Sequence, residues 1–242
     1  MAELVQERTM DAAWRTAVAR LRALGDECYD LLVEIEDPST TSAHGEVSRR
    51  VDAVLAARGQ DGVSTVANTI FPAALAASSR DRTTLYRRYE AILPILRRDR
   101  KNKKGMYFER LIRYPLQDDP ERMNQLELTI SNLQRQLATR QPRRHAYELQ
   151  VFGPGKDRLP MGFPCMSSLS VHIDSGNLRL AATYRNQYYV RKALGNFLGL
   201  SRLQGWIAHE VGLPVGALSV HAFHAEIDPD LRTHAVQRAL GV

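Results

Sequence analysis

The sequence Gly-Phe-Pro-Cys-Met at residues 162–166 is followed by three positions at fixed distances from its cysteine. Arg185 lies twenty residues after Cys165, Asn196 lies eleven residues further on, and Ala-Glu-Ile-Asp occupies residues 225–228. A proline before the cysteine and two serines after it are typical of a loop that enters a strand beside a cleft. A lone cysteine is more often a small buried hydrophobe than a nucleophile. Cys165 alone therefore indicates little about function, and the spacing of the other positions relative to it is more informative.

The composition is that of an ordinary folded protein. The 242 residues are 44% hydrophobic and 25% charged, with a formal net charge of +6. No linker-like break interrupts the chain, so we expect one domain over residues 1–242, with a core that needs no disulfide or metal. No apolar run approaches the roughly 20 residues that cross a bilayer, and the acidic N-terminus does not match a signal peptide. We therefore expect a cytoplasmic protein without membrane contact.

The cysteines and the basic residues narrow the classes of site. Cys28 and Cys165 are too few for a disulfide framework and too isolated for a zinc site, so two free thiols and no metal are expected. Much of the positive charge falls in residues 97–104, Arg-Arg-Asp-Arg-Lys-Asn-Lys-Lys. For this run we favour a solvated loop over contact with phosphate, and we do not expect nucleic-acid binding.

Hydrophobic periodicity predicts an α+β fold in which helices pack on a largely antiparallel sheet. Pro72 is expected to start a turn or a helix, and Asn68 is expected to cap that helix rather than contact a ligand. Asp174-Ser175-Gly176 predicts a hairpin turn. Helices are predicted over residues 10–24, 47–57, 82–96, 124–137 and 197–211 and from about residue 229, and strands over residues 29–35, 146–152, 167–173, 177–183 and 217–223.

From residue 159 onward, the order and spacing of the marked positions resemble the thymidylate synthases, the family that includes the deoxycytidylate hydroxymethylases. In that family a Pro-Cys carries the nucleophile, a Gln-Arg-Ser holds the nucleotide phosphate, an asparagine binds the pyrimidine, and a His-x-Tyr binds the sugar. The matching positions here are Pro164-Cys165, Tyr184-Arg185-Asn186, Asn196 and Glu226-Ile227-Asp228. The resemblance implies a twisted, largely antiparallel sheet, packed by helices, with one face forming a homodimer interface.

Weaker similarities extend upstream to about residue 105. Residues 124–126, together with Pro142-Arg143-Arg144, are similar to family segments whose arginines cross the dimer interface to the partner's phosphate site. The resemblance thus implies that Arg143 and Arg144 reach the other subunit. Residues 104–107, Lys-Gly-Met-Tyr, are similar to a family segment that ends in tyrosine, which implies a catalytic place for Tyr107.

The family's reaction implies a role for each matched residue. The Cys165 thiolate would add to C6 of a uracil-type ring, and Asn196 would donate to O4 and accept from N3–H while C5 attacks a one-carbon electrophile. Arg185, together with Arg143 and Arg144, would bind the phosphate of a pyrimidine nucleoside monophosphate or a related molecule. The resemblance thus implies a methyl- or hydroxymethyltransferase, with 5,10-methylenetetrahydrofolate as donor and Asn186 in the substrate site.

Departures from the family pattern keep two alternatives open. Glu226 and Asp228 replace the sugar-binding histidine and tyrosine, so they would hold the sugar differently or hold another group. Met166 replaces a histidine, Tyr188 replaces a folate-contacting aspartate, and the family's arginine loop, last strand and mobile tail have no counterpart. One alternative is an enzyme of this fold with a different nucleotide-like substrate and no folate. The other is a non-catalytic nucleotide-binding protein.

Overall fold

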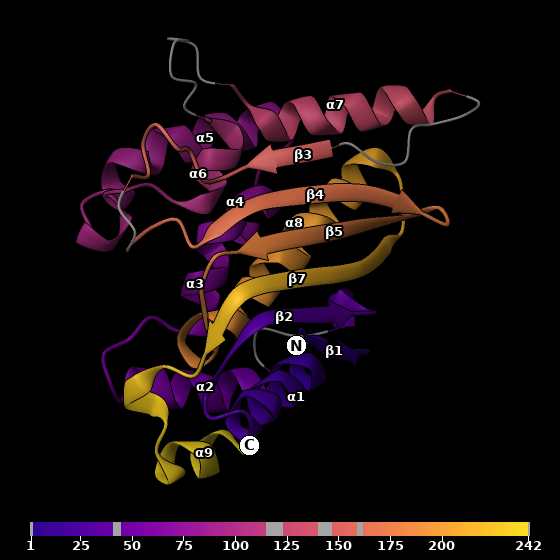
Figure 1. Cartoon of the computed structure of the whole chain (residues 1–242). Coiled ribbons are helices and arrows are strands. Elements are labelled where there is room, and N and C mark those ends of the chain that lie inside the picture. Colours follow the sequence, from indigo (N-terminus) through magenta and orange to yellow (C-terminus); the bar gives the residue numbers. More distant parts are fainter. Residues whose placement is uncertain (1, 41–44, 115–122, 140–146, 159–161, 242) are drawn as a thin grey trace.

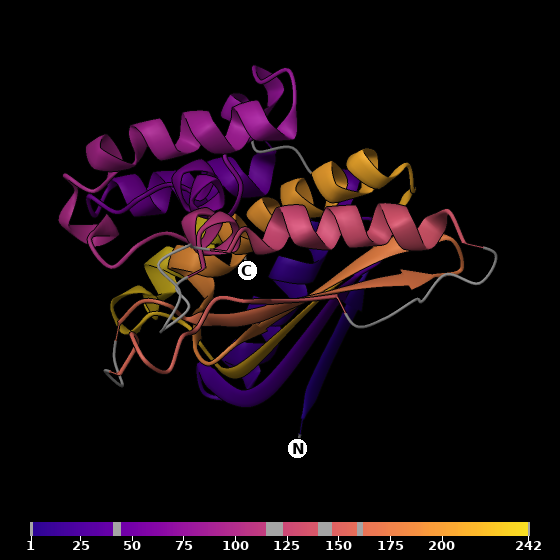
Figure 2. The ribbon, with the colours of Figure 1, turned by 90° about the horizontal axis from the view of Figure 1, so that it is seen from above.

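The computed structural model describes residues 2–40, 45–114, 123–139, 147–158 and 162–241. In this part of the chain, helices cover one face of a seven-stranded mixed sheet (Figure 1, Figure 2). Along the central strands, buried side chains alternate with partly exposed ones, and the buried ones form the core under the helices. The strands are β1 (Glu3–Glu7), β2 (Glu27–Ile35), β3 (Tyr147–Gln150), β4 (Met166–Asp174), β5 (Asn177–Tyr184), β6 (Gln187–Tyr188) and β7 (Val215–Glu226).

The strand order is β1-β2-β7-β5-β4-β3, with β6 paired to β7. The α+β class is confirmed, but the expectation of a largely antiparallel sheet needs correction. The β2–β7, β3–β4 and β4–β5 pairs are antiparallel, whereas the β1–β2, β5–β7 and β6–β7 pairs are parallel. The parallel pairs arise because a helix follows β1 and another follows β6, and each crossover returns the chain in the same direction.

Five predicted helices are confirmed with ends shifted by at most three residues, whereas the last helix begins at His234 and residues 229–231 form a separate 3-10 turn. Pro72 stands directly before a short helix, as expected. Asn68 lies inside the preceding helix, so the prediction that it caps the next one is wrong. The helices are α1 (Met10–Ala23), α2 (Glu46–Ala56), α3 (Val63–Ile70), α4 (Ala73–Ala77), α5 (Arg82–Leu96), α6 (Tyr107–Ile112), α7 (Gln125–Leu137), α8 (Leu194–Val211) and α9 (His234–Leu240).

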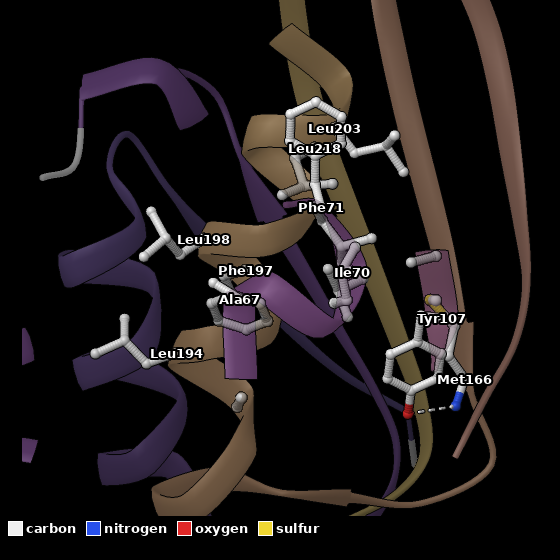
Figure 3. Packing of buried hydrophobic residues seen from close by; sticks show 14 of the residues in the cluster. Ala67, Ile70, Phe71, Tyr107, Met166, Leu194, Phe197, Leu198, Leu203 and Leu218 are labelled. Atoms are coloured by element: carbon white, nitrogen blue, oxygen red, sulfur yellow. Dashed lines mark hydrogen bonds between the residues drawn. The ribbon is translucent and has the colours of Figure 1, made fainter. Parts of the chain in front are cut away.

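The N-terminal helices share one hydrophobic core with the sheet (Figure 3). Trp14 of α1 is fully buried and donates its indole N–H to the carbonyl oxygen of Tyr189 at 2.7 Å. A buried indole N–H needs an acceptor, and here the acceptor belongs to a segment that is far away in the sequence. The first hundred residues are thus packed against the part of the chain that carries the marked residues.

Two glycines let α3 and α8 approach each other closely. A Cβ atom at Gly195 would lie 2.6 Å from the Cβ of Val66, and one at Gly199 would lie 2.7 Å from the carbonyl oxygen of Ala67. Figure 3 shows Ala67 and Ile70 of α3 beside Phe197 of α8. This contact sets the distance between the helical layer and the first turn of α8, where Asn196 lies.

We expect Gly199→Ala to lower the free energy of unfolding by about 1–3 kcal/mol, because the backbone of α3 cannot move away cheaply. Gly205 lies in the same helix with nothing within 4 Å of an added Cβ. Gly205→Ala should therefore raise stability by about 0.5–1 kcal/mol through helix propensity alone. Urea unfolding of both variants measures the two effects. Equal effects of the same sign would contradict the close packing of α3 on α8.

Candidate functional site

A cavity of about 870 Å³ lies between the sheet and the N-terminal helices. One wall is built by the loop before β4, the segment from β5 to β6 and the start of α8. The opposite wall is built by α3, α4, α5 and residues 99–107. Cavities of this size and composition commonly hold small organic ligands. The sheet contributes mainly polar groups, and the helices contribute Val66, Leu75, Ile92 and Leu96 as apolar ones.

Five of the residues singled out from the sequence line this one cavity. They are Tyr107, Cys165, Arg185, Asn186 and Asn196. They come from four different segments of the chain, so only the fold brings them together. Asn196 is almost fully buried and makes no hydrogen bond through its side chain within the described part of the chain. Its amide is therefore available to a ligand.

Cys165 lies directly before β4 and is half-buried. Its carbonyl oxygen accepts a hydrogen bond from the backbone N–H of Arg185 at 2.9 Å, which ties the thiol-bearing loop to the end of β5. Burial raises the pKa of the Cys165 thiol, while the positive charges of Arg185 and Lys192 act in the opposite direction. Burial thus disfavours the thiolate, which is the nucleophilic form of the cysteine, and the two nearby cations favour it.

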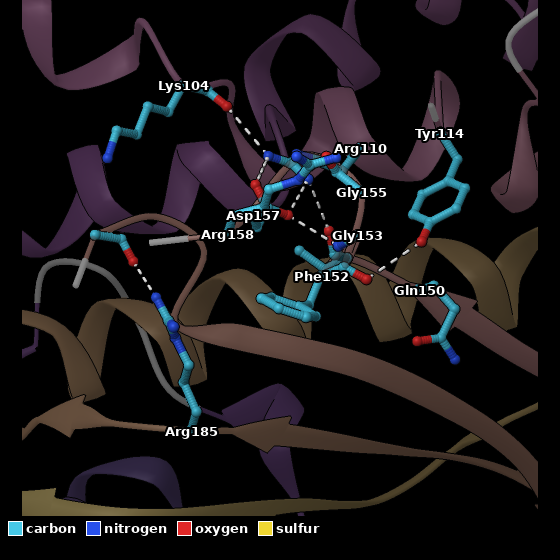
Figure 4. Close-up of polar contacts among 12 residues, drawn as sticks. Lys104, Arg110, Tyr114, Gln150, Phe152, Gly153, Gly155, Asp157, Arg158 and Arg185 are labelled. Atoms are coloured by element: carbon cyan, nitrogen blue, oxygen red, sulfur yellow. Dashed lines mark hydrogen bonds and ion pairs between the residues drawn. The ribbon is translucent and has the colours of Figure 1, made fainter. Parts of the chain in front are cut away.

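Tyr107 and Arg185 flank the cysteine. The backbone N–H of Met166 donates to the Tyr107 hydroxyl at 3.5 Å (Figure 3), and burial raises the pKa of Tyr107 far above its usual range. Arg185 donates to the carbonyl oxygen of Gly162 and lies over the ring of Phe152, 5.9 Å from its centre (Figure 4). These contacts place the guanidinium group at the edge of the cavity, where its planar donors suit an anion such as phosphate.

Glu226 and Asp228 are not among the residues that line the cavity. Asp228 is fully buried, and its carboxylate accepts hydrogen bonds from the backbone N–H groups of Val190 and Arg191, each at 3.1 Å. Burial raises the pKa of Asp228, and these hydrogen bonds oppose that shift. Glu226 accepts from the side chain of Asn186 at 3.3 Å. Both acidic side chains therefore bind residues next to the cavity and help to hold its wall in place.

The remaining sequence-based candidates have different outcomes. Arg143 and Arg144 lie outside the described residues, so their place relative to the cavity stays a prediction. The basic run is not only a solvated loop, because Lys101 and Asn102 line the cavity. Lys101 forms an ion pair with Asp61 at 2.9 Å, and Arg97 pairs with Glu109.

Several cavity residues were not found from the sequence. Lys192 lies in a π-helical turn, Tyr189–Ala193, and Gln187 lies in β6. Both amide atoms of Gln187 are buried without a hydrogen-bond partner among the described residues, which is rare for a native side chain. The family pattern marks neither position, and helical periodicity cannot show where a π-turn directs its side chains. The wall thus carries polar groups beyond the expected set.

Comparison with known proteins adds no name to this site: no family model matches the chain, and no curated protein matches it. Within the described ranges, no group of three or more His, Cys, Asp or Glu side chains could hold a metal ion. The same part of the chain contains no helix that is long and apolar enough to cross a membrane. The cavity is therefore the feature of the described structure that bears most directly on function.

At one position the cavity wall departs from the folate site that the resemblance implies. Tyr188, a phenol, lines the wall at the position of the family's folate-contacting aspartate. The carboxylate of Asp61, which also lines the wall, is occupied by Lys101.

Proposed function

We propose that the protein is a cysteine-dependent enzyme that acts at C5 of a uracil-type nucleotide, as thymidylate synthase-like transferases do. The observation that supports this proposal most strongly is the shared cavity of Tyr107, Cys165, Arg185, Asn186 and Asn196. A nucleophile, an amide that can bind an imide edge, and a cation for phosphate are the three groups such chemistry needs. Here the fold gathers all three around a space large enough for a nucleotide.

The reaction begins when the Cys165 thiolate forms a bond to C6 of the ring. The C5–C6 π electrons move toward O4, and the resulting enolate makes C5 nucleophilic. The Asn196 amide stabilises the enolate by donating to O4, and it accepts from N3–H. C5 then takes an electrophile, either a one-carbon unit at the oxidation level of formaldehyde, which becomes a hydroxymethyl group, or, in its absence, a solvent proton. Loss of the original C5 proton and of the thiolate restores the ring.

The proposal includes a homodimer built on the sheet face opposite the helices. Leu4, Leu32 and Phe223 lie on this face with exposures of 58%, 39% and 50%. Leu4 pairs with Leu32 in the β1–β2 register, and Phe223 lies two residues beyond the partner of Leu32 on β7. Apolar side chains that are exposed together on one sheet face suit contact with a second copy. In that assembly Arg143 and Arg144 would reach the partner's phosphate site.

A second candidate is nucleotide binding without catalysis. The observation that favours it is the raised pKa of the Cys165 thiol, because a protonated thiol is a weak nucleophile. An enzyme with a different nucleotide-like substrate would equally suit the placement of Glu226 and Asp228 away from the cavity. Both alternatives retain the phosphate contact of Arg185, so binding and turnover have to be tested separately.

Binding is tested by calorimetry with uridine, cytidine and deoxyuridine monophosphates. We expect the uracil nucleotides to bind, and we expect Arg185→Ala to weaken them about tenfold or more, because a charge-assisted contact to phosphate is lost. Deoxyuridine, which has no phosphate, is the matched control and should bind both proteins alike. The proposal fails if no uracil nucleotide binds, or if Arg185→Ala binds nucleotide and nucleoside as the wild type does.

A further inference from the structure

Lys192 is a cationic group of the cavity wall that the proposed reaction leaves without a role. Its side chain is exposed to solvent where it lines the cavity. Among the described residues, no side chain or backbone group forms an ion pair or a hydrogen bond with Lys192. A lysine without such a partner in a ligand-sized cavity is available to a reacting group.

The turn that carries Lys192 is held in place from two sides. On one side, the buried carboxylate of Asp228 accepts from Val190 and Arg191. On the other side, the indole of Trp14 donates to the carbonyl oxygen of Tyr189. Single π-turns inside helices are frequent at functional sites, since the extra residue redirects the side chains that follow. The anchored turn thus fixes the backbone from which the Lys192 side chain extends into the cavity wall.

The charged groups around the thiol and the amine act on each other. Arg185 and Lys192 both favour the thiolate form of Cys165, whereas burial opposes it. Burial lowers the pKa of Lys192, Asp61 and Asp228 oppose that shift, and Lys101 reinforces it. Asp61 is already bound to Lys101. The positive charge of Lys192 therefore offsets part of the cost of ionising the half-buried Cys165 thiol.

We propose that Lys192 activates Cys165 by stabilising its thiolate as a counter-ion in the shared cavity. The S–H bond breaks, the proton passes to solvent, and the electron pair stays on sulfur for attack at C6. When the thiolate leaves C6 at the end of the reaction, it can take a proton from solvent again. The inference rests on the proposed function in taking Cys165 as the nucleophile, but the reactivity of the thiol can be measured without a nucleotide.

The test is the pH profile of Cys165 alkylation by iodoacetamide in the ligand-free protein, followed by peptide mass spectrometry. Below the pKa of the thiol, Lys192→Met should slow the reaction about tenfold and move the profile upward by about one pH unit, because a nearby cation is lost. Lys192→Arg, which keeps the charge, should stay within about twofold of the wild type. Cys28, a half-buried residue of β2 outside the cavity, is the internal control and should react alike in all variants.

A matched variant separates local from general charge effects. Lys103 is exposed, belongs to the basic run and does not line the cavity, so Lys103→Met should leave the Cys165 profile unchanged. The inference is overturned if Lys192→Met leaves that profile unchanged, or if Cys165 stays unreactive in the folded wild type across the range. If the profile shifts while no nucleotide binds, the effect of Lys192 on Cys165 is supported and the proposed nucleotide substrate is wrong. If nucleotides react while the profile stays fixed, only the role of Lys192 falls.

Discussion

Replacing Cys165 with alanine is expected to stop exchange of the C5 proton of deoxyuridine monophosphate with solvent deuterium. Addition of the thiolate to C6 is the step that makes C5 basic, so no other group of the cavity can substitute for it. The exchange rate, followed by loss of the C5 proton signal in D₂O, should fall about 1,000-fold or more. This readout needs no one-carbon donor and therefore tests the nucleophile by itself.

The fold of the Cys165→Ala variant should be preserved. The side chain is only partly buried, and the loop is held by the backbone bond between Cys165 and Arg185. Cys28→Ala is the matched control, since Cys28 lies in β2 away from the cavity and should leave exchange unchanged. Exchange at the wild-type rate in folded Cys165→Ala protein would rule out the proposed reaction.

The largest effect on stability is expected at the buried ion pair of Arg110 and Asp157. Their side chains are 2% and 7% exposed and form two hydrogen bonds, at 2.7 and 2.8 Å (Figure 4). Arg110 also donates to the carbonyl oxygens of Val151 and Lys104. Arg110→Met should lower the free energy of unfolding by about 3–5 kcal/mol, because it leaves a buried carboxylate without its partner.

The pH dependence of this effect follows from the carboxylate. Burial would raise the pKa of Asp157, but hydrogen bonds from Arg110 and from the backbone N–H of Gly153 outweigh it, and the pKa falls below its usual 3.8. The stability from Asp157 is thus present above 3.8 and lost as the pH falls through the lower folded-state value. The gap between wild type and Arg110→Met should therefore narrow in acid.

Urea unfolding at neutral and acidic pH measures the effect of Arg110→Met. Arg80→Met is the control, because the Arg80–Asp81 pair is exposed to solvent and should contribute little to stability. Equal losses in the two variants, or a gap that widens in acid, would contradict the role of the buried pair. Since Arg110 also holds the Lys104 carbonyl close to Tyr107, the variant should weaken nucleotide binding as well.

The sequence predicts those elements of the fold whose signals are local. The apolar stripe of α7 and the Asp-Ser-Gly turn between β4 and β5 are strong local patterns. In contrast, α3 begins at Val63 after a glycine that has no side chain to cap it. The backbone N–H of Val63 instead donates to Asp52 of α2, which only the folded chain brings near. β1 has one buried residue, Val5, and therefore lacks a clear alternation. The start of α3 and the position of β1 are therefore set by tertiary contacts, which local sequence patterns do not show.

The same distinction applies to the site. The resemblance to a family pattern marked Cys165, Arg185 and Asn196, and the fold brings these three residues to one cavity. The spacing gives the place of Asp228 in the sequence but not the groups that surround it in the fold. It therefore could not show that the Asp228 carboxylate faces the backbone of the π-turn. Lys192 was missed for the related reason that the π-turn changes the helical phase.

The most direct test of the central claim is mass spectrometry of the protein after incubation with 5-nitro-deoxyuridine monophosphate. The nitro group stabilises the carbanion at C5, so thiolate addition to C6 should leave a nucleotide attached to the peptide that contains Cys165. We predict that adduct on Cys165 and none on Cys28, with much less in Lys192→Met protein. A protein that binds the nucleotide but carries no adduct on Cys165 would contradict the account.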